Sequence, residues 1–110
     1  MQTIKGITQS IENLQARIDA ENRSAQQERS QAAEYRKSSD GARAQAHDRT
    51  AQDHERRALQ MQDDIAKYVQ EQEKIQAQIT ELDRKKGAAL ANRDDEVASY
   101  DSEITRLRGY

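Results

Sequence analysis

The stretch "KSSDGARA", residues 37–44, decides the fold, because it interrupts a chain that otherwise consists largely of helix-forming residues. Ser39 and Asp40 are good N-caps, and Gly41 suits the left-handed residue that often ends a helix. Arg36 and Lys37 place positive charge in the last turn of the preceding helix, as the C-terminal end of a helix dipole favours. The stretch therefore predicts a turn at 38–41 between two helices.

On both sides of this turn, residues that are mostly apolar or small recur at alternating spacings of three and four, which is the heptad pattern of a coiled coil. The row of positions that this spacing places on one side of a helix, facing its partner, is here called the seam. Before the turn, the frame comprises Ile4, Ile7, Ile11, Leu14, Ile18, Glu21, Ala25, Glu28, Ala32 and Tyr35. After the turn, it comprises Ala44, His47, Ala51, His54, Ala58, Met61, Ile65, Tyr68, Gln72, Ile75, Ile79 and Leu82. The two frames are out of phase across the turn, which supports a break there.

When the chain is folded back about residue 40, large seam residues face large ones and small seam residues face small ones. Leu14 then lies near Ile65, and Ile18 near Met61, while the alanine-rich parts of both seams meet beside the turn. This symmetry predicts an antiparallel helical hairpin, with helix 1 at about 3–38 and helix 2 at about 42–86. A single unbroken helix in a parallel dimer is the alternative, since a phase break can be absorbed as a local change of supercoil.

A further helical segment is expected at about 88–108. Lysines before Gly87 favour a helix end there, and Asn92 followed by acidic residues resembles a capped start. The segment either continues helix 2, through a stutter after Leu82, or folds back as a third helix. The expected fold is thus all-α: an elongated antiparallel coiled-coil hairpin that forms one domain over residues 1–110.

The final segment carries a third apolar seam, which helix 1 is too short to cover. This seam comprises Leu90, Val97, Tyr100, Ile104 and Leu107. Helix 2 offers only a modest second face for a fold-back, chiefly Leu59, Ala66, Val69 and Ala77. Surplus apolar surface of this kind is usually buried against another chain. We therefore expect these five seam residues to bind a protein partner or a second copy of the chain.

The composition limits the class of protein. The chain has 110 residues, of which 34% are apolar, with no proline or cysteine and a net charge of -2. Low apolar content raises the alternative of disorder, but balanced charges and the lack of proline favour helix. Disulfides are excluded, no apolar run is long enough to cross a bilayer, and the N-terminal residues lack the pattern of a secretory signal. We expect a cytoplasmic protein.

Two histidines are the strongest candidates for site chemistry. His47 and His54 lie seven residues apart, about 10 Å along a helix, which is too far for one metal ion. They are better interpreted as half-buried polar seam residues that fix the pairing register. No phosphate-binding loop and no nucleophile with a positioned base occurs in the sequence. We expect no enzyme activity, metal or cofactor.

Basic residues gather around the predicted turn, foremost Arg36, Lys37 and Arg43. Nearby acidic residues dilute this charge, which disfavours nucleic acid as a partner. The sequence therefore predicts a non-enzymatic protein interaction module, a scaffold, stalk or adaptor, that forms a homo-oligomer or docks on a larger partner. The alternative is a small regulatory inhibitor or adaptor that binds an enzyme or a nucleic-acid complex through this basic tip.

Overall fold

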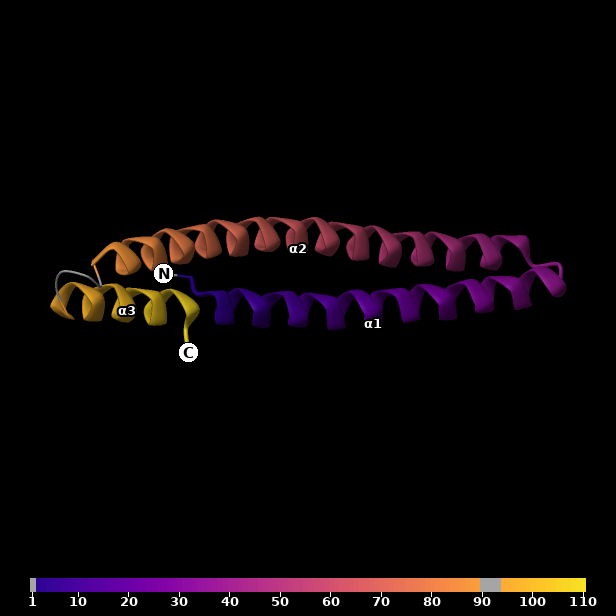
Figure 1. Cartoon of the computed structure of the whole chain (residues 1–110). Helices are drawn as coiled ribbons and strands as arrows, with labels where there is room; N and C mark the ends of the chain where they lie inside the picture. The colour runs from indigo at the N-terminus through magenta and orange to yellow at the C-terminus, as the bar shows by residue number, and fades with distance from the viewer. Residues whose placement is uncertain (1, 90–93) are drawn as a thin grey trace. The chain divides into compact units, whose positions relative to one another are not determined.

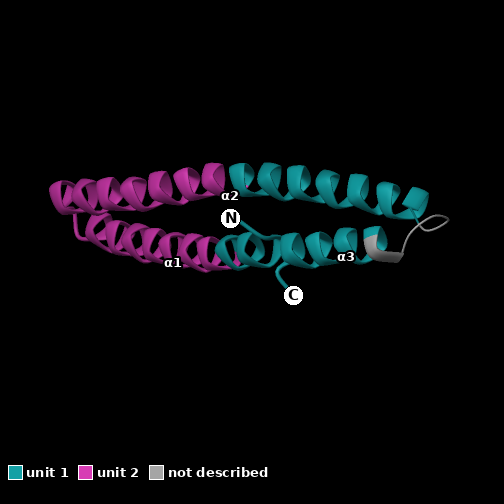
Figure 2. Cartoon of the chain, turned by 90° about the vertical axis from the view of Figure 1, so that its left-hand side faces the viewer, with its two compact units in different colours: residues 1–11, 66–110 teal, residues 12–65 magenta. Residues whose placement is uncertain are grey.

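The computed structural model describes residues 2–89 and 94–110. Within these residues the chain forms three α-helices: α1 (Ile4–Lys37), α2 (Gly41–Ala89) and α3 (Asp94–Arg108) (Figure 1). The all-α class is confirmed. The helices make two compact units: unit 1 consists of Met1–Ile11 and Ala66–Tyr110, and unit 2 of Glu12–Ile65 (Figure 2).

The turn between α1 and α2 is closed by local hydrogen bonds. The backbone N–H of Asp40 donates to the carbonyl of Tyr35 (2.8 Å), and that of Ser39 donates to Arg36 (3.1 Å), which together form a Schellman motif. The Asp40 carboxylate then caps α2 by accepting from the N–H of Arg43 (3.1 Å). This N-cap confirms the role expected of Asp40.

The left-handed residue of the turn is Ser39, with a φ of 61°, and not Gly41 as expected. Gly41 is already the first residue of α2, because Asp40 occupies the capping position immediately before it. The Schellman motif places the left-handed residue just before Asp40, whose N–H closes the wider of its two hydrogen bonds. The chain therefore reverses two residues earlier than the glycine indicates.

Unit 2 is an antiparallel helical hairpin. Its apolar cluster consists of buried Ile18, Ala58 and Met61, with Leu14 and Ile65 packed against them. Nearer the turn, the buried side chains are alanines from both helices: Ala25, Ala32, Ala44 and Ala51. These contacts lie within one chain and confirm the predicted hairpin; the alternative of one unbroken helix is wrong.

Unit 1 combines the start of α1, the second half of α2 and the whole of α3. Contrary to the expected end near Lys86, α2 continues through Gly87 to Ala89, and α3 folds back against it. Buried Ile79, Ile104 and Leu107 form the cluster here, with Ile4, Ile75 and Leu82 packed against it. The third-helix alternative is therefore correct.

α3 packs on the seam of α2, and not on the second face of this helix that the sequence suggests for a fold-back. This seam keeps its heptad frame beyond Leu82, through half-buried Lys86 to buried Ala89, without a stutter. In unit 1 the first turns of α1 and the last turns of α3 thus share one seam of α2. Lys86, at a seam position, reaches across to Asp101 of α3 (Nζ to Oδ1, 2.6 Å).

The end of α3 meets the start of α1. Thr3 Oγ1 accepts a hydrogen bond from the N–H of Gly6 (3.0 Å) and caps α1. Gly109 follows α3 with a φ of 85°, and a Cβ at this position would lie 2.5 Å from Thr3 Oγ1 and 3.1 Å from Lys5 Cβ. Only glycine meets both the left-handed backbone and this close approach.

Candidate functional site

Polar layers alternate with the alanines in the seam of unit 2. His47 Nδ1 lies 2.5 Å from Oε2 of Glu28, and His54 Nδ1 lies 2.5 Å from Oε2 of Glu21. All four side chains are half-buried, between 21% and 30% exposed. Each histidine thus pairs with a glutamate on the facing helix, and both histidines are half-buried, as expected of polar seam residues. Among the described residues, no three side chains are arranged to hold a metal ion.

Glu21 has a lowered carboxyl pKa in the folded hairpin. The hydrogen bond from His54 is the main cause that lowers the pKa of its carboxyl below 4.5, and the nearby Arg57 guanidinium (3.3 Å) lowers this pKa further. Partial burial opposes both effects. The folded hairpin therefore favours the ionised carboxylate more than the unfolded chain does.

We expect this pKa difference to make unit 2 sensitive to acid. A lowered folded-state pKa stabilises the protein above the unfolded value of 4.5, and this contribution is lost as the pH falls through the folded value. Glu21→Gln should therefore be less stable than the native protein at about pH 6, and the difference should shrink toward about pH 3. Urea unfolding followed by circular dichroism across this range would measure it.

Glu12→Gln is the matched control, because Glu12 is exposed and lies off the seam. Its stability difference from the native protein should stay small at every pH in the series. If Glu21→Gln and Glu12→Gln gave the same pH profile, the Glu21 layer would have no special part in the acid response.

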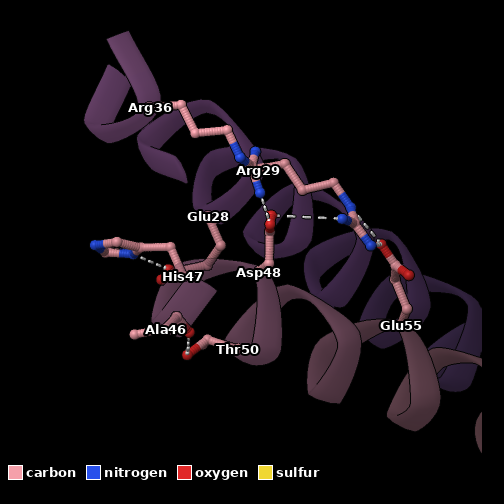
Figure 3. A network of polar contacts seen from close by, with 8 residues as sticks. All are labelled: Glu28, Arg29, Arg36, Ala46, His47, Asp48, Thr50 and Glu55. Atoms are coloured by element: carbon pink, nitrogen blue, oxygen red, sulfur yellow. Dashed lines mark hydrogen bonds and ion pairs between the residues drawn. The ribbon is translucent and has the colours of Figure 1, made fainter. Parts of the chain in front are cut away.

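An ion-pair network bridges the two helices of unit 2 near the turn (Figure 3). Arg29 of α1 lies between two acids of α2: its Nη2 is 2.8 Å from Oε1 of Glu55, and its Nη1 is 3.7 Å from Oδ1 of Asp48. Arg36 approaches Asp48 from the other side. The network adds charge complementarity to a part of the hairpin whose apolar contacts are small.

The basic tip residues all contact acids of the same unit. Arg36 pairs with Asp48, Lys37 Nζ lies 3.4 Å from Oε1 of Glu34, and Arg43 Nε lies 3.4 Å from Oδ2 of Asp40. Arg43 also lies over the ring of Tyr35, 5.6 Å from its centroid, and this ring stacks on the imidazole of His47 at 5.3 Å. The positive charge at the tip is therefore balanced locally.

Of the five residues expected to bind a partner, the four that the structure describes differ in how far the chain itself buries them. Leu90 lies outside the described residues. Val97 and Tyr100 are half-buried, whereas Ile104 and Leu107 are buried within unit 1. Ile104 and Leu107 are thus brought together with Ile79, and most of their apolar surface is covered by the chain's own α2.

Two adjoining grooves remain on one side of α2 in unit 1, and Gln78 and Leu107 line both. The first, of about 450 Å³, adds Ala77 and Leu82 to its floor; the second, of about 240 Å³, adds Ile75. Charged side chains from α2 and α3 form the rims: Glu71, Lys74, Glu81, Lys85 and Glu103. The arrangement is an apolar floor with a charged border.

Sequence reasoning missed the α2 side chains of this border. Glu71, Lys74, Gln78, Glu81 and Lys85 follow one another at spacings of three and four. They form a stripe one position before the seam, here called the border stripe. The spacing of these five residues carries the signal, but a search for apolar seams does not detect a stripe that contains no apolar residue.

No described helix has the length and apolar character needed to cross a bilayer. Comparison of the chain with protein-family models, curated proteins and solved structures gives no match.

Proposed function

We propose that the chain is a non-enzymatic protein interaction module, a scaffold, stalk or adaptor, that acts by pairing its α2 with a helix of a protein partner. The observation that carries this proposal is the pair of adjoining grooves along α2. An apolar floor bordered by charges is the surface that helix-in-groove recognition uses, with the floor contributing affinity and the border specificity.

The final segment contributes one of its predicted seam residues to the lining of both grooves. Leu107, one of the predicted partner-binding residues, lines both grooves. Ile75 and Leu82 lie next to it and are only half-buried by the chain itself, so each offers apolar surface to a docking helix. A partner helix would bury this surface further and thereby gain binding free energy.

The alternative, an inhibitor or adaptor that binds through the basic tip, has less support. Arg36, Lys37 and Arg43 already contact acids of the same unit, so a partner would have to compete with these ion pairs. Nucleic-acid binding in particular draws on basic side chains that are available to phosphates.

A photoreactive amino acid in place of Gln78, compared with one in place of Asp83, tests the proposed function. Both positions are exposed on α2, but Gln78 lines the grooves and Asp83 does not. In the cells that make the protein, irradiation should cross-link position 78 to protein, and excess unlabelled native chain should suppress that adduct. Equal protein adducts at both positions, or none at 78, would contradict the proposal.

A further inference from the structure

We propose that the helix seated in the α2 groove belongs to a second copy of this chain, which docks antiparallel about a two-fold axis at Gln78. This inference rests on the proposed function and names its partner. It follows from the order of charges in the border stripe. When two copies of the stripe run in opposite directions, each charged residue of one copy faces a residue of opposite charge in the other.

An isologous interface requires that when residue i contacts residue j, j also contacts i. In an antiparallel helix pair about Gln78, this rule brings together residues that lie equally far before and after that position, to within one residue. Glu71 and Lys85 lie seven residues to either side. Lys74 lies four residues before Gln78, and Glu81 three residues after it.

The reversed stripe therefore sets opposite charges against each other. Glu71 faces Lys85 of the second copy and Lys74 faces its Glu81, and the symmetry repeats both pairs. A parallel arrangement in the same register would instead place Glu71 against Glu71 and Lys74 against Lys74, which repel. The charges thus select the antiparallel direction and fix the register at Gln78.

The side chains needed for these contacts are accessible. Lys74, Gln78, Glu81 and Lys85 are exposed, and Glu71 is half-exposed. Glu81 pairs with Arg84 of its own helix (2.7 Å), which lowers the pKa of its carboxyl, so Lys74 of the second copy would share this carboxylate with Arg84. Between the charges lie Ala77 and half-buried Ile75 and Leu82, which supply the apolar contact.

Charge exchange tests this arrangement directly. The lysine variant carries Glu71→Lys with Glu81→Lys, so its border stripe is positive; the glutamate variant carries Lys74→Glu with Lys85→Glu, so its stripe is negative. In sedimentation at low salt, the native chain should dimerise. Each variant alone should dimerise at least about tenfold more weakly, a change of about 1.4 kcal/mol. An equimolar mixture of the two should recover a dimer.

Glu73→Lys with Asp83→Lys is the matched control. It makes the same change of charge at exposed positions on the same part of α2, off the border stripe, and its dimerisation should stay native. Circular dichroism of all variants checks that the helices remain formed. Recovery in the mixture cannot arise from misfolding, because it requires each variant to present its stripe to the other.

Three results would overturn the second copy as partner: a native chain that remains monomeric, variants that dimerise like the native chain, or a mixture that remains monomeric. The cross-linking at position 78 separates these failures from that of the proposed function. If the chain does not dimerise but position 78 cross-links to a different protein, the proposed interaction module would stand and the two-fold dimer would be excluded.

Discussion

Ile79→Ala should destabilise unit 1 by about 3 to 4 kcal/mol, the cost of truncating a fully buried large aliphatic side chain. Ile79 is 0% exposed and touches the buried residues of α3, so its loss leaves a cavity where α3 meets α2. Amide hydrogen exchange should accelerate throughout α3, and denaturant unfolding would give the free energy. Few single substitutions in proteins of this size cost more.

Leu59→Ala is the control, because Leu59 on the same helix is 62% exposed. Its substitution should change the free energy of unfolding by about 0.5 kcal/mol or less. If Ile79→Ala cost no more than Leu59→Ala, or if α3 exchanged at its native rate, the packing of α3 on the α2 seam would be wrong.

Ala51→Leu should destabilise unit 2 by about 2 to 3 kcal/mol, although leucine is a good helix former. Ala51 is 0% exposed and lies between the two polar layers, where buried alanines of both helices leave no room for a larger side chain. Separating the helices to admit leucine would lengthen the contacts from His47 to Glu28 and from His54 to Glu21. Thermal unfolding would measure the effect.

Ala46→Leu makes the same substitution on the exposed side of the same helix. It should change stability by about 0.5 kcal/mol or less, so the comparison separates overpacking from helix propensity. A hairpin that accepted leucine at 51 as readily as at 46 would not have its two helices in close approach near the turn.

The heptad spacing was sufficient to predict the hairpin and the residues of its apolar cluster, because buried side chains in a coiled coil must recur on one side of each helix. Leu14, Ile18, Met61 and Ile65 form the cluster of unit 2 as that spacing requires. The same frames place Glu21 and Glu28 at seam positions of α1 and the histidines at seam positions of α2. Which histidine meets which glutamate depends on the register near the turn, and the structure supplies it.

The left-handed residue of the turn and the packing of the third helix were harder to predict. Both depend on backbone hydrogen bonds and helix contacts that residue type alone does not indicate. A glycine beside Asp40 suits a left-handed residue, yet the capping geometry places Ser39 there. Similarly, Lys86 and Ala89 are not residues that mark a core, so the extension of the α2 seam beneath α3 was not recognised. Small and charged seam residues are the ones that an apolar pattern overlooks.

The contact between Gly109 and Thr3 has a mechanical consequence. A force applied between these two residues would act on points that already lie close together, at the ends where α1 and α3 are held on the α2 seam. In unit 1 the seam layers would then open one after another, as in a zipper, instead of sliding past each other all at once. Unit 1 would therefore yield to such a force layer by layer, beginning at its own chain ends.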